Sequence, residues 1–155
     1  MRRALPGCGL KCPGSPASRI TPMATSAPIL LVEPDRLVRD RIVLALAGLD
    51  PSLDVILAAD GVEALALAEW RPPRLVLLDL LLPRRSGLDV LRDLRARFGE
   101  QLPIIVISAL GLREIVQRAI AAGASDFVVK PIDARLLVEK VRLALPQAGP
   151  ARETA

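Results

Sequence analysis

Five short, continuous apolar runs alternate with longer segments in which apolar residues recur every three or four positions. The apolar runs occupy residues 29–32, 53–58, 75–78, 104–107 and 127–129. They lack polar alternation, which is typical of parallel β-strands buried on both faces. The longer segments, with the period of amphipathic helices, occupy residues 36–47, 61–70, 88–97, 112–122 and 134–145. The pattern predicts a strand–helix unit repeated five times.

Local signals mark the ends of these segments. We expect Gly48, Gly99 and Gly123 to close helices, and Asp133 is suited to N-cap the last one. The Asp60-Gly61 dipeptide is a turn signal that needs no functional interpretation. Such a succession predicts one α/β domain: an open parallel sheet with helices on both faces and functional residues at the carboxyl ends of the strands.

Composition separates this domain from its ends. With 155 residues, 52% of them apolar, the chain has the size and the core of a single domain. Residues 1–27 are rich in Pro, Gly, Ser and Ala and contain no acid, so we predict a disordered N-terminal extension. The domain is then expected over 28–146 and a flexible tail over 147–155. Met23 is a candidate translation start, and Cys8 and Cys12 are interpreted as incidental.

Charge and missing residue types exclude several functions. The net charge of +4 arises from four basic residues among the first 22, and 17 basic residues meet 17 acidic ones from Met23 onward. A nucleic-acid-binding surface is therefore not expected. The chain has no histidine, which removes imidazole bases and histidine metal ligands. No apolar run approaches the roughly 18 residues that a membrane span needs, so we expect a cytoplasmic protein.

Polar residues stand at the predicted carboxyl ends of three strands. Asp79 ends the third, Ser108 and Ala109 end the fourth, and Lys130 ends the fifth. Lys130 is one of three lysines among 21 basic residues, and its ammonium suits a carboxylate or a phosphoryl group. These groups suit phosphoryl transfer to a carboxylate, assisted by a divalent cation. Asp79 by itself is equally consistent with a loop cap.

Three segments together resemble the receiver domain of response regulators in two-component signalling. They are Asp79-Leu-Leu-Leu-Pro83-Arg-Arg-Ser-Gly87, Ile104-Ile-Val-Ile-Ser108-Ala109 and Gly123-Ala-Ser-Asp-Phe127-Val-Val-Lys130-Pro131. The resemblance covers about residues 28–146. It implies a flavodoxin-like fold with a five-stranded parallel sheet in the order 2-1-3-4-5.

The resemblance also implies roles for individual residues. Asp79 would be the phosphoacceptor, Lys130 would contact the phosphoryl group, and Ser108 would be the hydroxyl that moves toward it. Phe127 stands at the position of the switch aromatic, although core packing explains it as well. The peptide bond after Lys130 is expected to be cis. Among backbone groups, the amides of Leu80 and Ala109 would bind the phosphoryl group.

A magnesium site is implied by the same resemblance, with one departure. Receivers usually carry two adjacent acids at the end of the first strand, but here Glu33 is followed by Pro34, which has no side-chain oxygen. The remaining ligands would be Glu33, the Asp79 carboxylate and the Leu81 carbonyl. Asp35 is as well suited to a helix start as to a metal, with Pro34 just inside that helix. We therefore expect weakened magnesium affinity.

Three functions are compatible with these residues. The first is a stand-alone receiver that is not an enzyme, accepts a phosphoryl group from a histidine kinase or phosphotransfer protein, and presents its fourth helix, fifth strand and fifth helix to an effector protein. The second is a phosphorylation-independent adaptor, which is favoured by Pro34 at the position of a metal-binding acid. The third, a cofactor-binding flavodoxin-like protein, is disfavoured because no Gly-rich loop follows the first strand.

Partners other than proteins are not expected: neither nucleic acid nor membrane binding is predicted, and homodimerisation is left open. Arg84 and Arg85 lie beside the proposed phosphorylation loop. They are compatible with steering an acidic partner or with a solvated face.

Overall fold

The five strand–helix units are present in the computed structural model, which describes residues 26–145. The elements are β1 (Ile29–Val32), α1 (Arg36–Leu49), β2 (Val55–Ala58), α2 (Gly61–Trp70), β3 (Leu75–Asp79), α3 (Gly87–Phe98), β4 (Ile104–Ser108), α4 (Arg113–Ala121), β5 (Asp126–Val129) and α5 (Ala134–Ala144). Every predicted element is confirmed, with ends that move by at most two residues. Asp79 and Ser108 are the last residues of β3 and β4, as expected.

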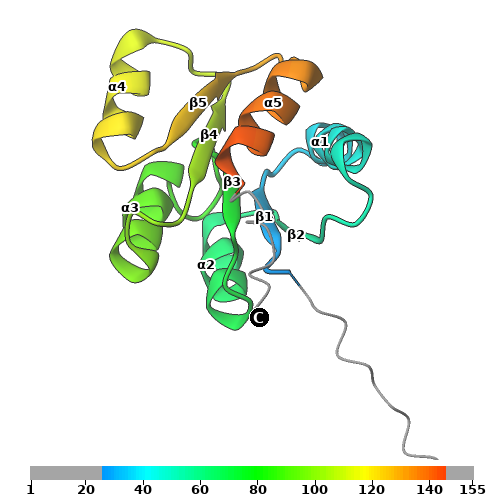
Figure 1. Ribbon diagram of the computed structural model, residues 1–155. Coiled ribbons are helices and arrows are strands. Elements are labelled where there is room, and N and C mark those ends of the chain that lie inside the picture. The colour runs from blue at the N-terminus through cyan, green and yellow to red at the C-terminus, as the bar shows by residue number, and fades with distance from the viewer. Residues whose placement is uncertain (1–25, 146–155) are drawn as a thin grey trace, which may run out of the picture.

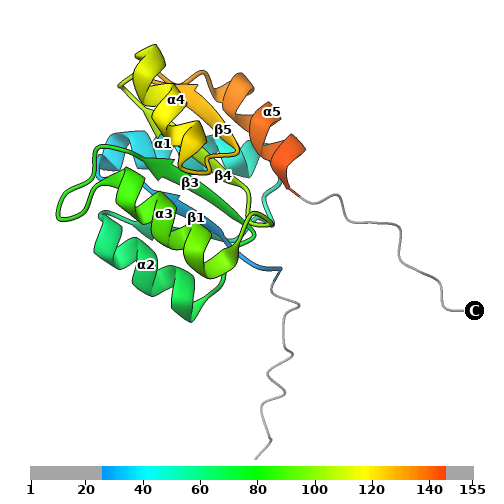
Figure 2. The ribbon, with the colours of Figure 1, turned by 90° about the vertical axis from the view of Figure 1, so that its left-hand side faces the viewer.

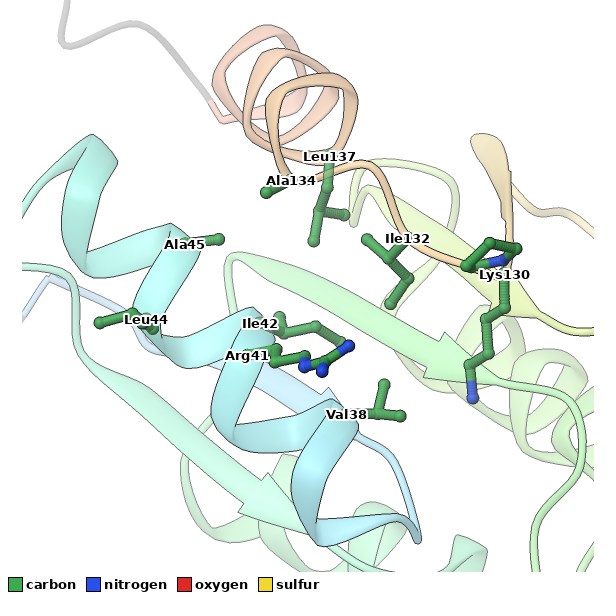
Figure 3. Close-up of a pocket in the computed structure, with 10 residues that line it drawn as sticks. Val38, Arg41, Ile42, Leu44, Ala45, Lys130, Ile132, Ala134 and Leu137 are labelled. Atoms are coloured by element: carbon green, nitrogen blue, oxygen red, sulfur yellow. The ribbon is translucent and has the colours of Figure 1, made fainter.

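The strands form one parallel sheet in the order β2-β1-β3-β4-β5, as predicted. Figures 1 and 2 show α1 and α5 on one face of this sheet and α2, α3 and α4 on the other. A groove of about 420 Å³ runs between α1 and α5 and reaches Lys130 and Pro131 (Figure 3). The arrangement brings the carboxyl ends of β1, β3, β4 and β5 to one edge of the sheet.

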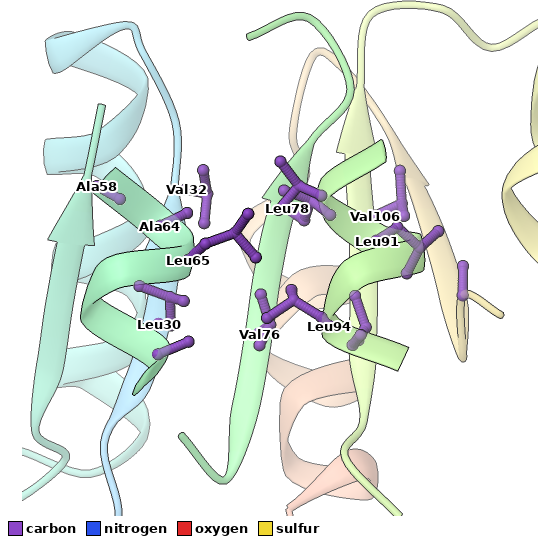
Figure 4. Close-up of a cluster of buried hydrophobic side chains, with 14 of the residues drawn as sticks. Leu30, Val32, Ala58, Ala64, Leu65, Val76, Leu78, Leu91, Leu94 and Val106 are labelled. Carbon is purple, nitrogen blue, oxygen red and sulfur yellow. The ribbon is translucent and has the colours of Figure 1, made fainter. Parts of the chain in front are cut away.

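The continuous apolar runs are explained by two separate cores. Because successive side chains of a strand point to opposite faces, Leu30 and Val32 pack under α2 and α3 while Ile29 and Leu31 pack under α1 and α5. Figure 4 shows the first core, where side chains of α2 and α3 cover alternate residues of β1 and β3. A polar residue on either face of these strands would therefore be buried.

Helix ends agree with the predicted signals except at Gly48. Asp133 N-caps α5 by accepting hydrogen bonds from the amides of Arg135 and Leu136. Gly99 caps α3 and Gly123 follows α4, with φ angles of 70° and 107° that favour glycine. The prediction that Gly48 closes a helix was wrong, because α1 continues to Leu49, which packs against the core.

Several predictions concern parts of the chain outside the described residues. The disorder predicted for 1–27 falls there apart from residues 26 and 27, and so do Met23, Cys8, Cys12 and the tail over 147–155. Within residues 26–145, no helix combines the length and the apolar character that crossing a bilayer requires.

Gly87 positions the turn that follows Asp79. Its amide donates a hydrogen bond to the carbonyl of Leu80 at 3.1 Å. A Cβ at Gly87 would lie 2.3 Å from the Asp79 carbonyl oxygen and 2.5 Å from the Leu80 Cα. Both contacts are with backbone, which cannot rotate away, so only glycine allows α3 to start this close to the end of β3.

We expect Gly87→Ala to lower the free energy of unfolding by about 1–3 kcal/mol, because the added methyl forces the end of β3 and the start of α3 apart. Urea unfolding measures the change. Gly48→Ala is the matched control: its Cβ meets nothing within 4 Å inside a helix, so it should stabilise the protein by about 0.5–1 kcal/mol. Equal effects of the two substitutions would contradict the close approach at Gly87.

Candidate functional site

Lys130 brings together the ends of three strands. Its ammonium nitrogen lies 2.7 Å from Asp79 Oδ2 and 2.8 Å from Glu33 Oε2. Asp79 ends β3, Glu33 follows β1, and Lys130 follows β5 at the edge of the sheet. The Asp79 carboxylate and the Lys130 ammonium, which the sequence places at the ends of the third and fifth strands, are thus in contact, and Glu33 joins them directly.

Burial makes this contact electrostatically strong. Glu33 is 1% exposed and Asp79 is 3% exposed, so neither carboxylate is well hydrated. Burial by itself disfavours the charged form of Lys130, but the hydrogen bond to Asp79 and the attraction of both Asp79 and Glu33 outweigh it and raise the pKa of Lys130 above its usual value. Two carboxylates and one ammonium leave the site with a formal charge of −1. That charge favours a bound cation, and an anionic phosphoryl donor needs such a cation to offset its repulsion from the site.

The hydrogen-bonding capacity of the Glu33 oxygens is only partly used by neighbouring groups. Its Oε1 accepts a hydrogen bond from the Asp35 amide at 2.9 Å, and its carbonyl accepts one from Arg39 Nη1 at 3.1 Å. Oε2 is close to the Lys130 ammonium, but within the described residues it accepts no well-directed hydrogen bond. A buried carboxylate oxygen with a free lone pair suits a hard cation such as Mg²⁺, which binds proteins through one or two carboxylates and keeps several waters.

Asp35 serves the start of α1. It is exposed, and its Oδ1 accepts hydrogen bonds from the amides of Leu37 at 2.8 Å and Val38 at 3.3 Å, so it is the N-cap. Pro34 therefore lies before the cap and not just inside the helix, which corrects our expectation. No three acidic or cysteine side chains converge on a metal geometry anywhere in residues 26–145.

The loop after Asp79 is anchored by the same carboxylate. Asp79 Oδ1 accepts a hydrogen bond from the Leu81 amide at 2.9 Å, while Oδ2 accepts from Lys130. Leu80 is buried and Leu81 is half exposed, so the chain turns outward between them. The carbonyl of Leu81 and the amide of Leu80 therefore lie in the loop that begins at the proposed phosphoacceptor.

Ser108 lies beside Asp79 in the sheet without bonding to it. Asp79 pairs in register with Ile107, one residue before Ser108. The Ser108 hydroxyl is buried and accepts a hydrogen bond from the Leu110 amide at 3.2 Å, and its carbonyl accepts one from the Lys130 amide at 2.9 Å. Ala109 is exposed between them. The hydroxyl must turn away from Leu110 if it is to reach a group on Asp79.

Two further expectations concern β5 and the turn after it. The Lys130-Pro131 peptide bond is cis, as predicted. Phe127 is half buried and packs against the core beneath α2 and α3. Core packing accounts for this position, and the switch role of Phe127 stays a prediction.

The sequence interpretation missed Asp60. It N-caps α2 through Oδ1, while Oδ2 forms an ion pair with Arg84 of the loop after β3. The cap hydrogen bonds, chiefly that from the Glu63 amide, together with Arg84 lower the pKa of Asp60. Asp60 followed three residues later by Glu63 is a capping-box pattern, which could have revealed the cap. The ion pair across the loop had no sequence signal.

Arg84 and Arg85 are both held by acids of the same chain. Arg84 has a φ of 63°, unusual for a residue with a side chain, and its pairing with Asp60 holds it in that conformation. Arg85 pairs with Asp93 of α3 at 2.5 Å. These two side chains brace the loop after β3 between α2 and α3.

Comparison with known proteins gives a consistent result. The family model described as "Response regulator receiver domain" matches residues 29–142. Response regulator MprA of Mycobacterium sp. (strain KMS) is 39% identical over 125 residues, which are 79% of this chain and 52% of MprA. The chain therefore spans about half the length of this curated relative.

Solved structures show the same similarity. The receiver domain of NtrX from Brucella abortus aligns with a TM-score of 0.69 and 36% identity, over 76% of this chain and 97% of that domain. A CheY-like receiver domain protein from Methanospirillum hungatei aligns with a TM-score of 0.69 and 27% identity, over 75% of this chain and 90% of that one.

We expect Lys130→Met to lower the free energy of unfolding at pH 7 by about 3 kcal/mol, because it leaves two buried carboxylates without a counterion. The control Lys140→Met removes an ammonium that pairs with the more exposed Asp126 and should cost about 1 kcal/mol or less. Chemical denaturation measures both, and equal losses would contradict a special role of the buried contact.

The same variant has a predicted pH dependence. Because the pKa of Lys130 is raised in the folded state, its stabilisation is complete below pH 10.5 and is lost as the pH rises through the raised value. The stability difference between the wild type and Lys130→Met should therefore shrink above about pH 10.5.

Proposed function

The chain belongs to the response regulator receiver domain family of two-component signalling, and from this premise we propose that Asp79 accepts a phosphoryl group from a histidine kinase or phosphotransfer protein. The phosphorylated domain then signals through a partner protein. The observation that carries the proposal is the buried carboxylate of Asp79 held by Lys130 at the carboxyl end of the sheet.

The chemical step is a phosphoryl transfer between two nucleophiles. A carboxylate oxygen of Asp79 attacks the phosphorus of a phosphohistidine or an acyl phosphate, the bond from phosphorus to the donor breaks, and the donor leaves with the bonding electron pair. The product is an aspartyl phosphate. Lys130, already 2.7 Å from Asp79 Oδ2, neutralises charge on the phosphoryl oxygens.

The signal follows from the added charge. An acyl phosphate on Asp79 brings further negative charge and new acceptor oxygens to a site whose cationic side chain is Lys130. The Ser108 hydroxyl then donates to the phosphoryl group instead of accepting from Leu110, and the amides of Leu80 and Ala109 supply backbone donors. When Ser108 moves, it releases the loop before α4 and leaves space into which the Phe127 side chain can turn. These two movements alter the surface formed by α4, β5 and α5.

Magnesium fits this proposal with a reduced set of ligands. Glu33, whose Oε2 is paired with Lys130 but accepts no well-directed hydrogen bond within the described residues, the Asp79 carboxylate and the Leu81 carbonyl would hold the ion. The cation would supply charge neutralisation for the phosphoryl group. Pro34 offers no oxygen where a second acid usually stands, so binding is expected to be weak.

The alternative function is a phosphorylation-independent adaptor. Two observations favour it: Pro34 offers no metal ligand, and Lys130 already pairs with both Asp79 and Glu33 in the resting structure. In that case the helical surface binds its partner constitutively. Both functions share the fold and differ in whether Asp79 is modified.

We expect incubation with acetyl phosphate and Mg²⁺ to add one phosphoryl group, detected by intact mass, and Asp79→Asn to abolish the adduct. Asp89→Asn is the control, because Asp89 is an exposed acid at the start of α3 that pairs with Arg92. It should keep the adduct. No adduct on the wild type even at high magnesium would favour the adaptor.

We expect Pro34→Asp to raise magnesium affinity about tenfold, the scale on which side chains around a metal change its affinity, and to speed phosphorylation. Isothermal titration with Mg²⁺ measures the affinity. Pro34→Ala separates the added carboxylate from the loss of the proline ring. Equal affinities of the Asp and Ala variants would mean that residue 34 does not face the metal.

A further inference from the structure

The tip of the loop after β3 is a turn that its central residue disfavours. The Arg85 amide donates a hydrogen bond to the Pro83 carbonyl at 2.7 Å, and Arg84 between them has a φ of 63°. This combination is the rare, strained form of a γ-turn. For a residue with a Cβ, the left-handed region is disfavoured by roughly a factor of ten. A contact from outside the turn is therefore needed to hold it.

Asp60 supplies such a contact. Its Oδ2 accepts one hydrogen bond from Arg84 Nε at 3.0 Å and a second from Nη2. Its Oδ1 accepts hydrogen bonds from the amides of Val62 at 2.8 Å and Glu63 at 2.9 Å, at the start of α2. Asp60 is only 7% exposed, so water competes little for these oxygens. One buried carboxylate thus ties the turn to the first residues of α2.

The backbone of the loop also lies directly against α2. A Cβ at Gly61 would lie 3.0 Å from the Arg85 Cβ and 3.1 Å from the Arg85 carbonyl oxygen. The Arg85 side chain pairs with Asp93 of α3. The turn therefore packs between two helices that are themselves fixed by the core beneath them.

A change in this turn reaches the backbone next to the proposed phosphoacceptor, because the loop is closed at its base. The Gly87 amide donates a hydrogen bond to the Leu80 carbonyl at 3.1 Å, which fixes both ends. Pro83 fixes its own φ and restricts the residue before it. If Arg84 leaves its positive φ, the change must be taken up mainly at Leu81, since the other side of the loop is packed against the helices.

We propose that Asp60 is a positioning residue of the phosphorylation site. Through Arg84 it holds the loop in the conformation that places the Leu81 carbonyl for magnesium and the Leu80 amide for the phosphoryl group. This inference rests on the proposed role of Asp79 and adds a residue outside the site that controls it. If the ion pair is lost, the turn relaxes. Only the molecules that keep the strained turn then bind magnesium well, and the apparent affinity falls with their fraction.

Asp60→Asn tests the ion pair in the full chain. Asparagine caps a helix as well as aspartate does, but it carries no charge. We expect hydrogen exchange of the Leu81 amide, followed by NMR, to accelerate about tenfold, the factor by which the turn is disfavoured. Isothermal titration should show a Mg²⁺ affinity reduced about threefold or more. Asp54→Asn is the matched control: it removes an ion pair with Arg71 at the opposite end of α2 and should change neither quantity.

Arg84→Ala and Arg84→Gly separate positioning from charge. Both remove the guanidinium, so a purely electrostatic effect on Mg²⁺ is the same in the two variants, whereas only alanine is strained at a positive φ. We expect the alanine variant to exchange faster at Leu81 and to bind Mg²⁺ about threefold more weakly than the glycine variant. In the Arg84→Gly background, Asp60→Asn should no longer accelerate exchange, because no strained turn depends on Asp60.

Equal exchange and equal Mg²⁺ affinity of the alanine and glycine variants would overturn the proposal, and so would exchange that changes without any change in Mg²⁺ affinity. Neither measurement requires phosphorylation. Failure to form the adduct with acetyl phosphate would therefore reject the proposed function and leave the role of Asp60 intact. An adduct on Asp79 together with unaltered exchange in Asp60→Asn would reject the role of Asp60 alone.

Discussion

The Lys130 ammonium, shared between Asp79 and Glu33, is the contact on which the arrangement of the site depends. Two carboxylates this deeply buried would repel each other and favour protonation if no cation lay between them. The ammonium comes from the edge strand, and the bond from the Lys130 amide to the Ser108 carbonyl holds its backbone beside β4. The pairing of the last two strands thus controls the electrostatics at the end of β1 and β3.

Pro34 changes the balance of this site. With one acid fewer than the family usually has, a single ammonium leaves a formal charge of only −1, so Lys130 contributes more of the neutralisation and a metal ion less. Asp35 does not replace the missing ligand in this structure, because its carboxylate caps α1. Both proposed functions, phosphoacceptor and adaptor, are compatible with this reduced pocket. They differ in whether the site still binds the cation and the phosphoryl group.

The fold was predictable because its signals are local. Continuous apolar runs exist because both faces of each strand are covered, and the helical period follows from one-sided burial. The errors lay at element ends. Gly48 does not stop α1 because Leu49 still gains core contacts, and Pro34 stays outside the helix because the Asp35 side chain satisfies the first amides. In the first place a tertiary contact outweighed the preference of glycine for helix ends, and in the second a side-chain hydrogen bond outweighed the preference of proline for the first helical turn.

The sequence by itself determined the five strand–helix units, the likeness to a receiver domain, and which residues stand at the carboxyl ends of strands. Only the tertiary structure decided that Lys130 reaches Glu33 as well as Asp79, that Ser108 is bonded to Leu110, and that Asp60 holds Arg84. The reason is physical. The periodicity of apolar residues reports which side of a helix or strand is buried. Contacts between distant side chains, such as Glu33 and Lys130 at 97 positions apart, depend on strand order and register, which no local pattern encodes.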